Sequence, residues 1–271
     1  MTSRKVAFIT GASRGIGRGC ALELAKSGFD LVLTARTVTG AERFEHSSTL
    51  RHSSTEALPG SLEKTAAEVS ALGAQALVVK LDLSVREDWA AAVEAAMARF
   101  GRIDVLVNNG RYVGPGHMDE FADTPVELIE QMFLCNVFAP LHLIKLCVPI
   151  MRRQHGGIVI HITSSAGETE TPKRIGEGGW GLGYSITKAA FNRMVPGLAK
   201  ELRDDNIAVI GLMPGFVTTE RTAIELRQHG FDTSKGLPVE NPGRVCALLA
   251  TADDPMRFSG QDIHGPTFVG Q

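Results

Sequence analysis

The sequence predicts a doubly wound α/β fold, a parallel β-sheet with helices on both faces, in a single domain spanning residues 1–271. Short runs that are apolar throughout alternate with longer segments of helical period. This pattern is typical of strands that are buried on both faces and joined by right-handed crossovers. No linker rich in Pro, Gly or Ser divides the chain, and its length suits one large domain.

The expected strands and helices follow one another along the chain in the manner of βαβ units. Strands are expected at Val6–Thr10, Asp30–Thr34, Ala76–Leu81, Val105–Val107, Ile158–Ile162 and Ala208–Met213. Helices are expected at Gly17–Ser27, Leu62–Leu72, Arg86–Phe100, Val126–Met151 and Tyr184–Leu202.

The polar segment 37–61 interrupts this alternation between the second expected strand and the next helix. It contains HSST twice, and we expect it to be an inserted, solvated surface loop. Its histidines, His46 and His52, are weak candidates for a metal site because no third ligand follows in a recognisable pattern. No metal site is predicted.

Composition and charge narrow the function classes. With 28 Lys and Arg against 30 Asp and Glu, the chain has no broad basic field to attract nucleic acid or anionic lipid. Val137–Met151 is broken by charges and prolines and is too short to span a bilayer, and no secretory signal pattern opens the chain. The four cysteines form no CxxC pair, which indicates reduced, buried thiols. We expect a cytoplasmic protein without membrane or nucleic-acid partners.

A glycine-rich turn, Thr10–Gly17 with the sequence TGASRGIG, directly follows the first expected strand and opens a helix. Glycines there permit a tight bend and let backbone N–H groups approach a pyrophosphate at the positive end of the helix dipole. No Lys-Ser/Thr pair follows, so the P-loop alternative fails. The turn predicts a dinucleotide ligand; the alternative is a turn that only packs the helix against the sheet.

The coenzyme is predicted from the end of the second expected strand. A fold that reads the adenosine 2′-hydroxyl places Asp or Glu there. This sequence has Arg36, with Arg14 in the glycine turn. Two guanidinium groups suit a 2′-phosphate, which favours NADP(H) over NAD(H). The alternative is that either arginine is a solvated surface charge.

The chemistry is predicted from a serine, a tyrosine and a lysine. Ser164 follows the Ile158–Ile162 strand, and Tyr184 and Lys188 lie four residues apart on one face of the next helix. A nearby ammonium favours the phenolate, which makes tyrosine a usable acid or base. The spacing YxxxK by itself is weak, because a packed tyrosine beside a surface lysine is commoner.

Further motifs agree with these in order and register: Asp82-Leu83, Asn108-Asn109-Gly110, Asn136 and the stretch Pro214–Thr219. Together the motifs resemble the short-chain dehydrogenase/reductase family over about Lys5–Gly265. The resemblance implies a Rossmann-type fold, an oxidoreductase that acts on carbonyl compounds and alcohols, and a homodimer or homotetramer paired through 126–151 and 184–202. The end of the long loop, Leu58–Leu62, resembles the hydroxysteroid-dehydrogenase-like-2 subgroup, which hints at a lipid-like substrate.

The resemblance also implies a role for each matching residue. Tyr184 would be the catalytic acid/base, and Lys188 would favour its phenolate and bind the nicotinamide ribose. Ser164 would orient the substrate oxygen; Ser165 is the competing serine but lacks the family's SxxG spacing. Asn136 would hold a water in the proton relay, or alternatively cap a helix irregularity.

The implied cofactor contacts are spread over the strand ends. They are Gly11, Ser13, Gly15, Ile16 and Gly17 at the pyrophosphate, Asp82 beside Leu83 at the adenine, Asn109 beside Gly110 on the adenosine side, and Pro214, Gly215, Val217 and Thr219 at the nicotinamide carboxamide.

Two departures from the family pattern concern the pocket. Arg111 replaces a glycine beside the cofactor, and we expect it to alter the backbone there or to point outward. Ser164 and Tyr184 are also separated by about seven residues more than is usual. We expect the extra length, within the substrate loop 168–183, to shape the pocket together with a second substrate loop at 218–236.

The sequence therefore predicts an NADP-dependent oxidoreductase for a small hydrophobic carbonyl compound or its alcohol. Apolar residues at the strand ends are candidates to line its cleft, or to be core or dimer contacts: Tyr112, Trp180, Leu182, Met213 and Phe216. The alternative is a catalytically silent protein that senses NADP(H) or serves as an interaction module.

Overall fold

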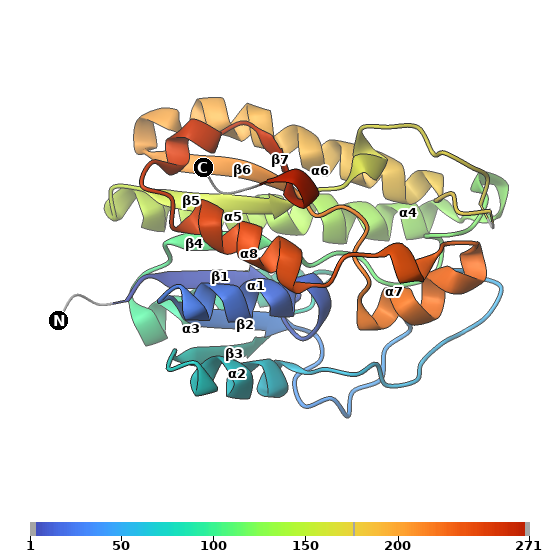
Figure 1. Ribbon diagram of the computed structural model, residues 1–271, viewed down its shortest axis with the longest axis horizontal. Coiled ribbons are helices and arrows are strands. Elements are labelled where there is room, and N and C mark those ends of the chain that lie inside the picture. The colour runs from blue at the N-terminus through green and yellow to red at the C-terminus, as the bar shows by residue number, and fades with distance from the viewer. Residues whose placement is uncertain (1–3, 176, 269–271) are drawn as a thin grey trace.

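Seven parallel strands form one sheet in the order β3-β2-β1-β4-β5-β6-β7, in a computed structural model that describes residues 4–175 and 177–268 (Figure 1). The strands are β1 (Val6–Thr10), β2 (Asp30–Ala35), β3 (Ala76–Lys80), β4 (Val105–Asn108), β5 (Gly157–Ile162), β6 (Ile207–Met213) and β7 (Asp262–His264). The order reverses where β1 pairs with both β2 and β4. Open α/β sheets bind ligands beyond the carboxyl ends of the strands at such a reversal.

The connections between the strands supply the helices of both faces. These are α1 (Gly15–Lys26), α2 (Leu62–Ala71), α3 (Arg86–Phe100), α4 (Val126–Phe133), α5 (Ala139–Arg153), α6 (Leu182–Glu201), α7 (Glu220–Glu225) and α8 (Glu240–Ala250). In Figure 1, α1 and α8 cross the face of the sheet nearer to the viewer.

Each face of the sheet has its own apolar core, because successive side chains of a strand point to opposite faces. In β1, Ala7 and Ile9 belong to the core shared with α1 and α8, whereas Val6 and Phe8 belong to the core shared with α3 and α5. All four side chains are essentially inaccessible to solvent. This confirms the prediction of a parallel sheet buried on both faces.

The predicted strands and helices are present, with ends that differ by at most two residues. The short elements α7 and β7 and the helix α8 were not predicted. The start of α8 has the sequence Glu-Asn-Pro-Gly, which resembles a turn. Proline is tolerated in a first helical turn. Gly243 lets α8 approach α1, because a Cβ atom there would lie 2.6 Å from the carbonyl oxygen of Gly19.

The expected helix 126–151 is longer and less regular than predicted. A π-helical turn, Leu134–Phe138, joins α4 to α5, so that Val126–Arg153 is continuous. This run of 28 residues is long and apolar enough to cross a membrane by length and composition alone, whereas the shorter stretch delimited in the sequence was not. Its most apolar window is 56% buried, with α5 packed in the core of the sheet.

The segment 37–61 contains no helix or strand, but it differs from a solvated loop in one part. The first HSST, His46–Thr49, is buried, with exposures of 0–5%. The carboxylate of Asp119 accepts hydrogen bonds from Thr49 Oγ1 and from Leu50 N (2.8 Å). The second HSST is largely exposed. The four cysteines are buried and free, as predicted.

Candidate active site

A cavity of about 1020 Å³ lies at the carboxyl ends of the strands, where the loops after β1 to β6 meet the segments 37–61, 168–183 and 218–236. Most of the predicted site residues line it: Gly11, Ser13, Arg14, Ile16, Arg36, Asp82, Leu83, Asn109, Gly110, Ser164, Tyr184, Lys188, Pro214, Gly215, Val217 and Thr219. Of the other predicted residues, Gly15 and Gly17 belong to the glycine turn, and Asn136 is buried.

The glycine turn fits a dinucleotide pyrophosphate. Gly11 and Gly15 have positive φ angles (69° and 57°), and a Cβ atom on Gly17 would collide with the carbonyl oxygen of Gly11. Gly15 N donates a hydrogen bond to Glu220 Oε2 (3.0 Å), so the start of α1 already holds an anionic oxygen. Such N–H groups at a helix N-terminus are what a phosphate needs.

Asn109 supports this turn from the end of β4. Its Nδ2 donates to the carbonyl oxygens of Thr10 (2.9 Å) and Gly11 (3.2 Å). In return, Thr10 Oγ1 accepts from the backbone N–H groups of Asn109 and Gly110. The asparagine therefore fixes the backbone of the cofactor turn in addition to lining the cavity.

The two arginines predicted to meet a 2′-phosphate are engaged by the 37–61 segment. Arg14 donates to the carbonyl oxygens of Leu58, Pro59 and Gly60 at 2.8–3.2 Å. The Arg36 guanidinium lies over the ring of Phe44, 4.6 Å from its centre.

Glu42 also lines this part of the cavity. Hydrogen bonds from backbone N–H groups, that of Thr39 first and those of Val38 and Gly40 after it, lower the pKa of its carboxyl group to about 2, so it is charged at neutral pH. The adenosine end therefore presents both signs of charge.

In two further segments that were predicted to contact the cofactor, side chains accept hydrogen bonds from the neighbouring backbone. Asp82 Oδ1 accepts from the N–H (2.9 Å) and the hydroxyl (2.7 Å) of Ser84. The hydroxyl of Thr219 caps α7 by accepting from Thr222 N (3.2 Å). These bonds hold the turns after β3 and β6 at the cavity wall.

Ser164 and Tyr184 meet despite their long separation in sequence. Tyr184 Oη lies 3.3 Å from Ser164 Oγ. Asn192, one turn beyond Lys188 on α6, holds the backbone of Ser164 by donating to its carbonyl oxygen (2.8 Å) and accepting from its N–H (3.4 Å). Ser165 lines the same cavity, but the phenol of Tyr184 donates its hydrogen bond to Ser164.

Lys188 is buried one turn after Tyr184, with 6% of its surface exposed. Its Nζ donates to the carbonyl oxygen of Ile162 (2.9 Å). Burial and the charge of Arg111 lower the pKa of Lys188 to about 7, while Asp262 acts in the opposite direction. Its charge therefore changes near neutral pH.

Asn136 lies in the π-helical turn, where the backbone ladder is irregular. Its Oδ1 accepts from Tyr112 N (2.6 Å), and its Nδ2 donates to Thr187 Oγ1 (3.0 Å). It thus connects this turn with the helix that carries Tyr184 and Lys188.

Comparison with known proteins decides the family. The model of the short chain dehydrogenase family matches residues 5–60 and 46–229. The chain belongs to the short-chain dehydrogenase family. It is accordingly an oxidoreductase of the NAD(P)-dependent type that acts on CH–OH groups.

Relatives of this dehydrogenase include 7alpha-hydroxysteroid dehydrogenase of Escherichia coli (strain K12), 28% identical over 216 residues, which cover 80% of this chain and 72% of the relative. Hydroxysteroid dehydrogenase-like protein 2 of Mus musculus is 31% identical and covers 94% of this chain, which spans about half (47%) of that protein's length. The crystal structure of 3-oxoacyl-[acyl-carrier protein] reductase from Brucella melitensis in complex with NAD is 26% identical, with a TM-score of 0.76 over 98% of this chain and 96% of the other.

Three further residues of the dehydrogenase's cavity were not assigned to the site from the sequence. Arg111, which was expected to disturb the turn or point outward, instead lines the cavity over the ring of Tyr184, with Cζ 5.6 Å from the ring centre. His117 packs against the same ring, with centres 4.2 Å apart. Arg221 on α7 completes the group. Of the three, only Arg111 carried a sequence signal, as a departure from the family's glycine.

Of the apolar candidates for the cleft, Tyr112, Trp180, Met213 and Phe216 line the cavity. Leu182 does not line it and is 45% exposed on α6.

Proposed function

We propose that this dehydrogenase interconverts a carbonyl compound and its alcohol with NADP(H), and that Tyr184 is the acid/base. The observation that carries the proposal is the hydrogen-bonding distance of 3.3 Å between Tyr184 Oη and Ser164 Oγ, one helical turn from the buried Lys188. A carbonyl oxygen placed between the two hydroxyls would accept a hydrogen bond from each.

The roles of the side chains follow from their contacts. Tyr184 donates its proton to the substrate oxygen in the direction of reduction and takes it back in the direction of oxidation. Ser164, fixed by Asn192, orients that oxygen. Lys188, when charged, favours the phenolate, and Asn136 supports the helix that carries both residues. A bound nicotinamide coenzyme supplies the hydride.

The coenzyme would be held by the glycine turn at its pyrophosphate, with Arg14 and Arg36 at the adenosine end as the reason to prefer NADP(H). Glu42 is the residue there that opposes a 2′-phosphate. Arg36→Asp should therefore weaken NADPH binding far more than NADH binding, measured by fluorescence titration. Glu42→Gln should do the opposite and strengthen NADPH binding. Equal losses of both coenzymes in Arg36→Asp would mean that this arginine does not bind the phosphate.

The catalytic assignment is tested by replacing each of the two phenols in the chain. Tyr184→Phe should lower kcat by at least about 100-fold in NADPH-linked reduction of a panel of carbonyl compounds, because a positioned acid contributes about that much or more. Tyr112→Phe is the matched control. Its hydroxyl donates to the carbonyl oxygen of Pro115, and burial raises its pKa to about 12, which unfits it for proton transfer. Undiminished turnover in Tyr184→Phe would refute the mechanism.

The same panel of carbonyl compounds distinguishes the enzyme from the alternative of a catalytically silent NADP(H)-binding protein. NADPH binding without turnover of any carbonyl compound would favour a sensor or interaction module. The geometry supports the enzyme, because serine, tyrosine and lysine converge on one cavity.

We further propose a homodimer or homotetramer that pairs the helices of 126–151 and 184–202. Apolar side chains are exposed on these helices: Val126 (65%), Phe138 (48%), Leu182 (45%) and Ile186 (36%). Light scattering after size exclusion measures the mass. A monomer at micromolar concentration would contradict the proposal, and Phe138→Glu should shift the wild-type mass toward that of one chain.

A further inference from the structure

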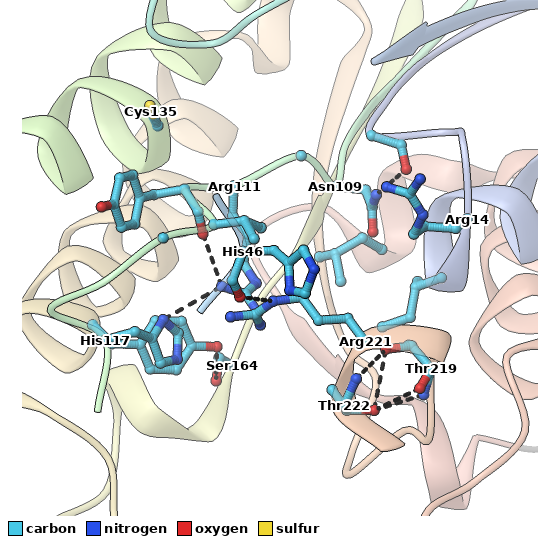
Figure 2. Close-up of a pocket in the computed structure, with 18 of the residues that line it drawn as sticks. Arg14, His46, Asn109, Arg111, His117, Cys135, Ser164, Thr219, Arg221 and Thr222 are labelled. Carbon is cyan, nitrogen blue, oxygen red and sulfur yellow. Dashed lines mark hydrogen bonds between the residues drawn. The ribbon is translucent and has the colours of Figure 1, made fainter. Parts of the chain in front are cut away.

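Two guanidinium groups lie at the end of the cavity that holds the phenol of Tyr184. Arg111 donates from Nη1 to the carbonyl oxygen of Tyr112 (2.9 Å) and lies 3.4 Å from His117 Nδ1. Its Cζ is 5.6 Å from the centre of the Tyr184 ring. Figure 2 shows Arg111 and Arg221 on the side of Ser164 and His117, away from Arg14.

Arg221 approaches from α7 and is held by the first HSST of the 37–61 segment. Its Nε donates to the carbonyl oxygen of His46 (3.2 Å) and its Nη2 to Ser48 Oγ (2.8 Å). The residue is 6% exposed and lines the cavity, and its Nη1 is buried without a hydrogen-bond partner among the described residues. A buried donor without a partner is costly and marks a place for an acceptor.

The positive charge of this pair is only partly offset, by Glu225, which acts against burial and Arg111 on the pKa of Arg221. Among residues 4–175 and 177–268, neither arginine has a carboxylate oxygen within 4.0 Å. The nearby Glu225 accepts from Ser48 N (3.1 Å) and lies 3.7 Å from His46 Nδ1.

The two arginines also act on each other and on the lysine. Burial and the charge of Arg111 lower the pKa of Arg221 to about 9 and that of Lys188 to about 7. Burial holds the pKa of His117 well below its usual range, so this histidine is neutral and adds no charge. An anion between the guanidinium groups would offset this repulsion and fill the position at Arg221 Nη1.

We propose that Arg111 and Arg221 bind an anionic group of the substrate, so that this dehydrogenase acts on short oxo acids and the corresponding hydroxy acids. The inference rests on the proposed function and adds the substrate class to it. Because Arg111 lies over the ring of the proton-donating phenol, the carboxylate must be within a few bonds of the carbonyl carbon. The apolar residues Phe231, Leu226 and Trp180 of the same cavity are available to contact the hydrocarbon part of the substrate.

The test compares acids with their uncharged esters. NADPH- and NADH-linked reduction of 2-, 3- and 4-oxopentanoate is measured beside that of the three methyl esters. A charge-assisted bidentate contact is worth about 1.5–3 kcal/mol, so one acid should exceed its ester in kcat/KM by about 10- to 100-fold. In Arg111→Met and Arg221→Met, the ratio of kcat/KM for acid and ester should fall about 10-fold, mainly through KM.

Control variants separate charge from folding. Arg244→Met removes an exposed arginine on α8 and should leave the ratio unchanged. Arg221 also supports the loop, so Arg221→Lys, which retains a charge, is compared where Arg221→Met fails to fold. Arg111→Met tests the same anion site without removing the hydrogen bonds between Arg221 and the 37–61 segment.

The outcomes distinguish this inference from the proposed function. Esters reduced as well as the acids, or an acid-to-ester ratio unmoved in the arginine variants, would overturn the inference and leave the proposed function standing. A loss of NADPH affinity that equals the loss of acid affinity would also overturn it, since the anion would then be a coenzyme phosphate. Should no carbonyl compound be reduced, the proposed function fails. The anion site is then decided by whether 4-oxopentanoate raises Tm in Tyr184→Phe but not in Tyr184→Phe/Arg111→Met.

Discussion

Replacing Lys188 by methionine should stabilise the folded protein at neutral pH although it removes a residue of the proposed catalytic set. The lysine is buried, and its pKa falls from 10.5 to about 7. A fall of this size corresponds to about 5 kcal/mol that opposes folding while the side chain is charged. Methionine has a similar length and no charge, so it relieves this cost.

The gain is reduced by one lost hydrogen bond. Lys188 Nζ donates to the carbonyl oxygen of Ile162, and leaving such a buried acceptor unpaired costs about 1–3 kcal/mol. The net expectation at pH 6–7 is therefore a stabilisation of about 2–4 kcal/mol.

The sign should reverse as the pH rises. Between pH 7 and pH 10.5 the unfolded chain keeps the lysine proton and the folded chain releases it. The free energy of unfolding of the wild-type protein therefore rises by about 1.4 kcal/mol per pH unit relative to that of the variant. Near pH 10.5 only the lost hydrogen bond remains, and Lys188→Met should be the less stable protein.

Urea unfolding at pH 6, 7, 8, 9 and 10, followed by circular dichroism, measures the difference in unfolding free energy. Lys200→Met, at an exposed position near the end of the same helix, is the matched control and should change stability little at any pH. A difference between the native protein and Lys188→Met that stays constant over this range would refute the assignment of a depressed lysine pKa.

Four other substitutions test features of the cavity and the core. Glu220→Gln removes the carboxylate that accepts from Gly15 N, and should tighten NADPH binding by about 3- to 10-fold in a fluorescence titration, since a like charge near the pyrophosphate is lost; weaker binding would contradict this. Asp262→Asn should raise Tm at pH 7 more than at pH 4: burial raises the pKa of this carboxyl group from 3.8 to about 6, so its contribution to stability is present below pH 3.8 and is lost as the pH rises through 6. Gly243→Ala should destabilise by about 1–3 kcal/mol because the new Cβ would lie 2.6 Å from Gly19 O, whereas Gly197→Ala on α6, with nothing within 4 Å, should stabilise by about 0.5–1 kcal/mol.

The parts of the site that the sequence predicted are those set by strand ends and helix starts. The glycine turn follows β1, and the serine follows β5. Parallel strands bring their carboxyl ends to one edge of the sheet, so these two segments lie at the same cavity. The intervening loop can then vary in length, which explains how Tyr184 still lies 3.3 Å from Ser164.

The features that the sequence did not predict depend on tertiary contacts. Helix α8 has a Pro-Gly pair in its first turn, and its close approach to α1 is visible only once Gly19 and Gly243 are placed together. The π-helical turn has no characteristic amino-acid composition by which the sequence could predict it. His46–Thr49 is polar, which favours a solvated loop, but hydrogen bonds to Asp119, Arg221 and Glu225 hold it in a buried position.

The inserted segment 37–61 and Arg111, which replaces the family's glycine, are far apart in the sequence but meet in the fold. The segment 37–61 supplies His46 and Ser48, and these two residues hold Arg221 beside the arginine that replaces the family's glycine, Arg111. The inserted segment thus holds the arginine that lies beside Arg111, so the pair depends on both the segment and the turn after β4. Ser48→Ala should therefore weaken the acid-to-ester preference, because it removes a hydrogen bond that holds Arg221. Ser53→Ala, in the exposed repeat of the same motif, is its matched control.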